Sequence, residues 1–269
     1  MNYMKKNSLP IGIFDSGVGG LTVLEQLIKV LPNENFIYFG DTAHVPYGNK
    51  SKETIKDYCK EIVSFLDKQS VKLIIVACNT ASSTALDVLC NQTKTPILNV
   101  IDPCVEQAVK TTKNNFIGVI GTKTTILSQA YKNRIKKTNS KINVYGKACS
   151  LFVPIIEESL VNNKIADEIV KFYLKDLPLK IDTLILGCTH YPLIKHIIKK
   201  ELSSNVNILD SSVITAKHVG SFLKNGKLLN PSRIKSKTLF FVSDDKEKFN
   251  FTIKKIMSNC NYEINKISL

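Results

Sequence analysis

The sequence lacks the features that mark membrane and secreted proteins. None of its apolar runs approaches the roughly 18 residues that a transmembrane helix needs. The first apolar run is interrupted by Pro10, Gly12 and Asp15, so it does not have the pattern of a signal peptide. The composition, 43% hydrophobic and 22% charged over 269 residues, is that of an ordinary globular protein. We therefore expect a cytoplasmic protein that makes no contact with a membrane.

Cysteine pairs of the kinds that carry structure are also missing. The chain has seven cysteines, an odd number, and none of them is in a C-x-x-C pair or has the spacing of zinc ligands. Because cytosolic thiols stay reduced, we expect neither a disulfide framework nor a metal site. Five cysteines are expected to be small buried residues without a chemical role: Cys59, Cys90, Cys104, Cys149 and Cys260.

Arginine is almost absent, although the chain is strongly basic. The net charge is +14, yet Arg134 and Arg233 are the only arginines among 37 basic residues. Arginine is the side chain that makes forked contacts with phosphates and bases. The lysines that supply the charge are spread over almost every segment, so we interpret them as a compositional bias. A nucleic-acid partner is the disfavoured alternative, and it predicts DNA binding that weakens steeply with salt.

Short apolar runs alternate with amphipathic segments along most of the chain. Apolar residues recur at helical spacing in residues 21–31 and 55–66. Strands that alternate with helices predict a doubly wound α/β architecture, in which helices cover both faces of a parallel sheet. The predicted strands are residues 9–14, 35–39, 73–77, 96–101, 116–120, 142–145, 183–186, 206–209 and 238–242.

Breaks after two of these strands divide the chain into two predicted α/β domains. They lie at Asp102-Pro103 and at Asp210-Ser211. The first domain then comprises residues 1–101 and 212–269, and the second comprises residues 102–211. Since no low-complexity linker separates them, we expect the two domains to pack together across a cleft.

Two cysteines stand at matching points of these domains. Cys78 and Cys188 each follow an apolar strand, and each precedes a predicted helix, starting near Thr80 in one case and at Pro192 in the other. Ligands of open α/β sheets bind at the carboxyl ends of the strands. The N–H groups at a helix N-terminus favour a thiolate over a thiol. Such a helix, worth about 1–2 kcal/mol, should lower the pKa of the cysteine by about one unit.

The repetition predicts two domains related by pseudo-twofold symmetry, with the active site in the cleft between them. Two thiols that face each other suit stereoinversion at carbon, since one group removes a proton from one face and the other returns a proton to the opposite face. Two alternatives stay open at this point. In the first, Cys78 and Cys188 are small core residues at strand ends. In the second, they form a redox pair, although the sequence does not show whether the two sulfurs lie within disulfide range.

Two further segments are candidates for the same site. Residues 11–20 form a strand, a glycine-rich turn and the start of a helix, without the pattern of a P-loop or a dinucleotide fingerprint. Asp15 and Ser16 would lie there at a strand end, where a carboxylate can hold an ammonium group or assist a thiol. Residues 40–51 contain a Pro-Tyr-Gly turn and form either an active-site loop or an ordinary surface loop.

Four blocks of this sequence resemble the signatures of the glutamate racemase family, in the order that the family has them. The blocks are residues 14–20, 46–51, 77–81 and 186–193. Aspartate racemases resemble the chain more loosely and are the nearest alternative. His44 departs from the family pattern, which usually has arginine beside the Pro-Tyr-Gly turn, and Ser150 stands where proline often follows the preceding cysteine.

The resemblance implies interconversion of L- and D-glutamate without a cofactor or a metal, for peptidoglycan synthesis, in a protein that forms a homodimer. Cys78 and Cys188 would be the catalytic acid/base groups, the first acting on D-glutamate and the second on L-glutamate. Glu157 matches a further auxiliary acid, although a solvated helix charge is an equal alternative. Asp15 and His190 would also assist the thiols. The substrate-binding residues implied by the family are Asp15, Ser16, Tyr47, Gly48, Asn79, Thr80, Thr122, Thr189 and His190.

Overall fold

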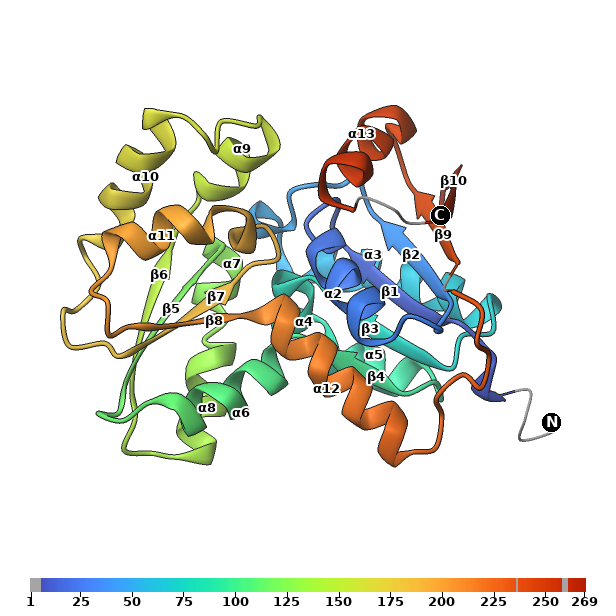
Figure 1. Cartoon of the computed structure of the whole chain (residues 1–269), viewed down its shortest axis with the longest axis horizontal. Coiled ribbons are helices and arrows are strands. Elements are labelled where there is room, and N and C mark those ends of the chain that lie inside the picture. Colours follow the sequence, from blue (N-terminus) through green and yellow to red (C-terminus); the bar gives the residue numbers. More distant parts are fainter. Residues whose placement is uncertain (1–5, 236, 258–260) are drawn as a thin grey trace.

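Two parallel β-sheets form the framework of the protein (Figure 1). The computed structural model describes residues 6–235, 237–257 and 261–269. The first sheet has six strands in the order β10-β9-β2-β1-β3-β4, and the second has four in the order β6-β5-β7-β8. The strands are β1 (Ile11–Asp15), β2 (Phe36–Gly40), β3 (Leu73–Val76), β4 (Ile97–Asn99), β5 (Phe116–Gly121), β6 (Asn143–Ala148), β7 (Thr183–Gly187), β8 (Asn207–Asp210), β9 (Thr238–Val242) and β10 (Tyr262–Lys266).

Every strand predicted from the sequence is present, with ends that differ by a few residues. The sequence did not predict β10. Its residues Tyr262–Lys266 alternate polar with apolar side chains and are mostly exposed, because this strand forms the edge of the first sheet beside β9. An edge strand has one free side and a weak apolar signal, and a short polar edge also limits pairing with other chains.

Helices cover both faces of each sheet, so the predicted doubly wound α/β class is confirmed. On the first sheet, α2, α12 and α13 pack on one face, and α3 and α5 pack on the other. No helix in the described ranges is long and apolar enough to cross a membrane. The α-helices are α2 (Leu21–Val30), α3 (Lys52–Lys68), α4 (Asn79–Thr84), α5 (Leu86–Gln92), α6 (Ile101–Thr111), α7 (Lys123–Leu127), α8 (Ala130–Thr138), α9 (Phe152–Glu157), α10 (Lys164–Leu174), α11 (Lys195–Glu201), α12 (Ser211–Asn225) and α13 (Lys246–Ile256), and the 3-10 helices are η1 (Tyr47–Asn49) and η2 (Tyr191–Ile194).

The two sheets repeat one strand order, as the predicted pseudo-twofold symmetry requires. The segment β2-β1-β3-β4 of the first sheet has the same order as β6-β5-β7-β8 in the second. Strand β1 therefore corresponds to β5, and β3 corresponds to β7. In both sheets the direction of winding reverses between these two strands, which is where ligands bind to folds of this kind.

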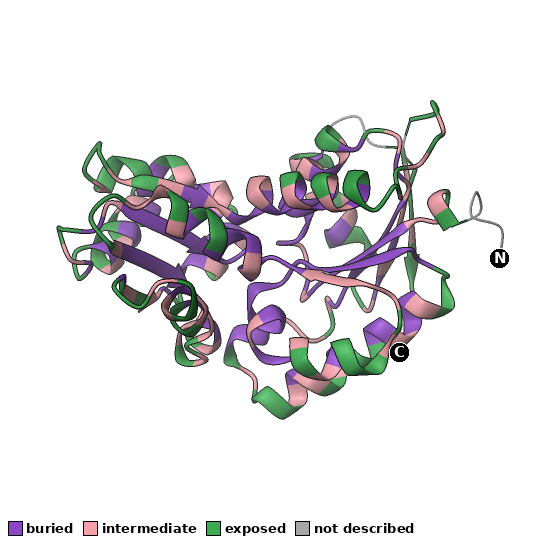
Figure 2. Ribbon diagram, turned by 90° about the horizontal axis from the view of Figure 1, so that it is seen from below, coloured by how far each residue is buried: buried purple, intermediate pink, exposed green. Residues whose placement is uncertain are grey.

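The chain passes twice between the sheets, from β4 into α6 and from β8 into α12. The predicted domain boundaries lie at these passages, and we keep them as a prediction. One apolar core joins the two halves, because Ile13 and Ile75 of the first sheet belong to the same buried cluster as Ile117 and Ile185 of the second. Figure 2 shows buried residues along the strands of both sheets. The halves thus pack against each other.

Candidate active site

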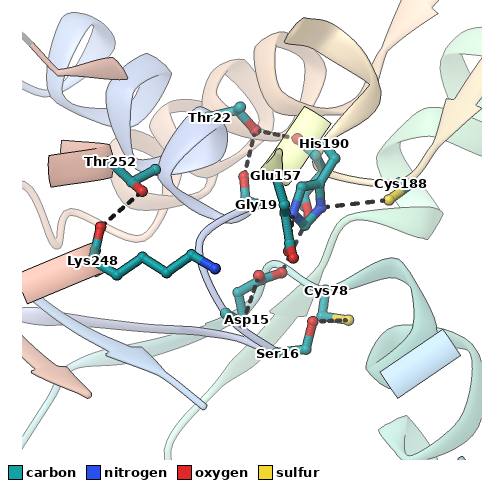
Figure 3. Close-up of polar contacts among 12 residues, drawn as sticks. Asp15, Ser16, Gly19, Thr22, Cys78, Glu157, Cys188, His190, Lys248 and Thr252 are labelled. Atoms are coloured by element: carbon teal, nitrogen blue, oxygen red, sulfur yellow. Dashed lines mark hydrogen bonds and ion pairs between the residues drawn. The ribbon is translucent and has the colours of Figure 1, made fainter. Parts of the chain in front are cut away.

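The strands at the two winding reversals bring the predicted catalytic residues together. Asp15 is the last residue of β1, and Cys78 follows β3 after one intervening residue. In the second sheet Thr122 follows β5 directly and Cys188 follows β7 directly. Figure 3 shows both sulfur atoms in one polar cluster with Asp15 and His190. The cysteines that the sequence places at matching points thus occupy equivalent positions of the fold.

Cys78 is surrounded by neutral polar groups and by one carboxylate. Its side chain is 5% exposed and caps α4, and its sulfur accepts a hydrogen bond from the N–H of Ala81 at 3.5 Å. The sulfur also lies 3.7 Å from the hydroxyl oxygen of Ser16. Burial raises the pKa of the Cys78 thiol from 9.0 to about 12, and the charge of Asp15 adds to this increase. The predicted decrease in pKa is therefore wrong for Cys78, because desolvation outweighs the contribution of the helix N-terminus.

Cys188 lies beside an ionisable base. Its sulfur is 3.8 Å from Nδ1 of His190, whose Nε2 lies 3.0 Å from a carboxylate oxygen of Glu157. Burial lowers the pKa of His190, but the hydrogen bonds with Cys188 and Glu157 outweigh burial and raise it from 6.5 to about 10. The raised pKa favours the imidazolium form of His190, and a cation next to a cysteine sulfur stabilises a thiolate over a thiol.

Glu157 is more than a solvated helix charge in this arrangement. Its side chain is 26% exposed, and it ends α9 with its carboxylate against the His190 ring. Burial raises the pKa of Glu157, but the hydrogen bond and the charge of His190, together with the charge of Lys248, lower it overall. The carboxylate thus stays ionised and orients the imidazole.

The α-helix predicted to begin at Pro192 begins later. The 3-10 helix η2 covers Tyr191–Ile194, and α11 starts at Lys195. Cys188 consequently does not cap an α-helix as Cys78 does, and its charged neighbour is a side chain instead. Among the cysteines expected to be buried, Cys90 is exposed, which corrects that prediction, and Cys260 lies outside the described residues.

Asp15 lies between the two halves and is completely buried. One carboxylate oxygen accepts the N–H of Gly17 at 3.0 Å, and the other accepts the hydroxyl of Thr189 from the second half at 3.3 Å. Burial raises the pKa of Asp15 above its usual range, against the opposing charge of His190. A side chain at Gly19 would collide with the His190 ring and the Thr189 hydroxyl, so the glycine-rich turn is what permits this close approach.

A group of hydroxyls joins the halves on the other side of the site. The hydroxyl oxygens of Thr80 and Thr122 are 3.0 Å apart, and that of Thr125 lies 2.9 Å from Thr122. The carbonyl of Gly48 accepts the Thr124 hydroxyl at 2.8 Å, which holds the Pro-Tyr-Gly turn against α7. The substrate-binding candidates Thr80, Thr122 and Gly48 are thus brought together. The sequence did not predict Thr125 as a member of this cluster of hydroxyls.

The loop of residues 40–51 is partly buried, with Asp41 and Tyr47 packed inward and Ala43 and Pro46 exposed. Tyr47 is 1% exposed, and its hydroxyl donates to a carboxylate oxygen of Asp41 at 2.5 Å. Nδ1 of His44 lies 2.8 Å from the same carboxylate, and the His44 ring stacks on Tyr58 with centroids 4.0 Å apart. The His44 departure is therefore accommodated by contacts with Asp41 of the loop and Tyr58 of α3. Ser150 is exposed, and nothing in the structure explains this departure from the family pattern.

Two residues near the site carried no signal in the sequence. Tyr131 of α8 donates a hydrogen bond from its hydroxyl to the side-chain oxygen of Asn79 at 2.6 Å. Lys248 of α13 extends toward the site (Figure 3). Tyr131 belongs to an ordinary amphipathic helix, and Lys248 lies beyond the last family signature, so only the tertiary structure brings them here.

A cavity of about 590 Å³ opens at the His190 end of the site. Gly19, Glu157 and His190 line one part of it, and Lys248 and Phe249 of α13 line another. Within the described ranges, no group of three or more histidine, cysteine or acidic side chains is arranged to hold a metal ion. Cys78 and Cys188 are both free thiols.

Known proteins are similar to this chain in both sequence and fold. The sequence pattern of the Asp/Glu/Hydantoin racemase family matches residues 11–219. The chain is 48% identical to a glutamate racemase of Geobacter metallireducens, with 87% of each chain covered, and 50% identical to one of Aquifex aeolicus, with 81% and 84% covered. The structure of a Francisella tularensis glutamate racemase in complex with D-glutamate matches with a TM-score of 0.89 at 40% identity, covering 97% of this chain and 98% of that one.

More distant structures agree in fold. A Bacillus anthracis glutamate racemase matches with a TM-score of 0.93 at 35% identity, with 98% of both chains covered. An aspartate racemase of Picrophilus torridus matches with a TM-score of 0.58 at 20% identity, covering 82% of this chain and 98% of that one, which shows a common fold alone. The chain therefore belongs to the Asp/Glu/Hydantoin racemase family and is an amino-acid racemase.

Proposed function

We propose that the protein interconverts L- and D-glutamate and that Cys78 and Cys188 transfer the protons. The observation that carries the proposal is the presence of two free thiols at equivalent strand ends, in one polar cluster with a buried carboxylate. The high identity to glutamate racemases supports glutamate as the substrate. Asp15 would accept the substrate ammonium, and the N–H and hydroxyl donors around Thr80 and Thr122 would hold a carboxylate.

The two thiols would act in different protonation states. Cys188, beside the imidazolium of His190, would remove the α-proton of L-glutamate as a thiolate and become a thiol. Cys78, whose pKa is raised to about 12, would give its S–H proton to the opposite face and become a thiolate. The product is D-glutamate, and the reverse reaction exchanges the roles. Burial of both sulfurs keeps water from the carbanion.

The substrate itself would adjust these charges. A bound ammonium group at Asp15 would offset the carboxylate charge that contributes to the raised pKa of Cys78. Loss of the Cys78 proton, which action on D-glutamate requires, would then be opposed mainly by burial. We further propose that the enzyme works in the cytoplasm as a homodimer, without a cofactor, and that its D-glutamate is used for peptidoglycan.

The test is racemisation of L-glutamate in D2O by protein freed of metal and pyridoxal phosphate, followed by circular dichroism and α-proton NMR. Wild type should lose the optical signal while deuterium enters the α-position. Cys78→Ser and Cys188→Ser should each slow racemisation by at least about 10³-fold, because each removes one proton-transfer group.

Cys90→Ser is the matched control, since Cys90 is a free, exposed thiol away from the site, and it should keep the wild-type rate. If the wild-type protein racemises aspartate but not glutamate, the proposed substrate is wrong and the protein is an aspartate racemase. If Cys78→Ser or Cys188→Ser racemises glutamate at the wild-type rate, the two-thiol mechanism is overturned.

A further inference from the structure

The side-chain amide of Asn79 is only half satisfied. Asn79 follows Cys78 directly and is 2% exposed. Its side-chain oxygen accepts the hydroxyl of Tyr131 at 2.6 Å, whereas its Nδ2 has no hydrogen-bond partner among the described residues. Buried polar groups are nearly always hydrogen-bonded, so an unpaired donor beside a catalytic cysteine points to a ligand atom.

Tyr131 reaches Asn79 from the other half of the molecule. It belongs to α8, is 3% exposed, and packs so closely on β7 that a side chain at Gly187 would lie 3.2 Å from its ring. Its ring thus contacts the residue before Cys188 while its hydroxyl contacts the residue after Cys78. Burial raises the pKa of Tyr131 well above 10, so the hydroxyl keeps its proton and can donate.

The orientation of an asparagine amide depends on such a partner. The oxygen accepts and the nitrogen donates, and the two ends have nearly the same shape. A donor hydroxyl at one end therefore places the oxygen there and turns the nitrogen to the other end. Without that hydroxyl the amide can rotate and present its oxygen, which repels a carboxylate.

We propose that Tyr131 is a positioning residue that locks the Asn79 amide with its N–H groups directed at a carboxylate of the amino-acid substrate. The lock forms between the two halves of the protein, so substrate affinity depends on their packing. This inference rests on the proposed function, because it assigns Asn79 to substrate binding.

The test is Tyr131→Phe, which keeps the ring and removes the hydroxyl. We expect KM for both glutamate enantiomers to rise about tenfold, the scale of one lost hydrogen bond to a charged group, with kcat changed by less than about threefold. Tyr262→Phe is the matched control, since it removes a similar hydrogen bond from a tyrosine to the side-chain oxygen of Asn250, 2.9 Å long and away from the site. The control should leave KM unchanged.

A double-variant cycle separates positioning from general loss of packing. Asn79→Ala should raise KM, and adding Tyr131→Phe should raise it no further if Tyr131 acts through Asn79. Additive effects, or an unchanged KM in Tyr131→Phe, would overturn the proposal. Thermal unfolding of each variant verifies that it is folded. A wild type inactive on glutamate would instead contradict the proposed function, which the wild-type assay reports separately.

Discussion

Cys78 and Cys188 occupy equivalent positions in two sheets of the same strand order, yet their surroundings differ. Cys78 contacts a backbone N–H and a neutral hydroxyl, and Asp15 helps to raise its pKa. Cys188 lies beside His190, which Glu157 holds in place. The repeated backbone thus makes two equivalent sites for thiols, while the side chains around them place a carboxylate near Cys78 and a histidine beside Cys188.

Among the groups that surround the two cysteines, the largest expected effect comes from removing the partner of Cys188. His190→Asn should lower kcat/KM by about 10²–10⁴-fold, because Cys188 loses its adjacent cation. Ser16→Ala should lower it by less than about tenfold, since Cys78 loses only a weak neutral contact. Steady-state circular dichroism with both enantiomers measures these values.

The two enantiomers have equal free energy, so kcat/KM must fall by the same factor in both directions in either variant. The rate at which deuterium from D2O replaces the α-proton, measured separately with L-glutamate and with D-glutamate, shows which of the two proton-transfer groups is impaired. His190→Asn should slow exchange from L-glutamate more than exchange from D-glutamate. Equal losses from both enantiomers would remove the functional difference between the two cysteines.

A smaller effect is expected when Glu157 loses its charge. The pKa of His190 in the folded protein is raised above its usual 6.5 to about 10, so the stabilisation from the charged ring is complete below pH 6.5 and is lost as the pH rises through about 10. Glu157→Gln removes one cause of this increase. The alkaline decline of both kcat/KM and the free energy of unfolding should therefore move to lower pH.

At pH 8 we expect activity of Glu157→Gln to be about three- to tenfold below wild type. Rate profiles and urea unfolding between pH 6 and 10 provide the measurement. If the alkaline limb stays in place, Glu157 does not control the charge of His190.

The smallest effect is expected at Lys248, which acts on the Cys188 side through Glu157. Its charge contributes to the lowered pKa of Glu157, after the effects of burial and of His190. Lys248→Met should raise that pKa, shift the acidic limb of kcat/KM to higher pH and reduce activity by about twofold, most clearly at low ionic strength.

Lys255→Met is the control for Lys248→Met, because Lys255 lines the same cavity but donates to the hydroxyl of Ser159 instead. It should leave the acidic limb unchanged. Identical shifts in both variants would indicate a general effect of net charge.

The sequence alone was sufficient for the α/β class, the strands apart from β10 and the two cysteine positions. Apolar runs of strand length and helical spacing of residues such as Ile55 and Ile62 are local properties, and the structure buries both residues as predicted. The motif residues around Cys78 and Cys188 could be recognised because they are contiguous along the chain.

Only the tertiary structure decided the electrostatics of the site. A helix N-terminus next to Cys78 is visible in the sequence, but the desolvation that outweighs it depends on everything packed around the sulfur. The contact of Glu157 with His190 and that of Tyr131 with Asn79 each join segments far apart in the chain. Local patterns determine which elements form, whereas charge and hydrogen bonding depend on distances that exist only after the two halves have packed together.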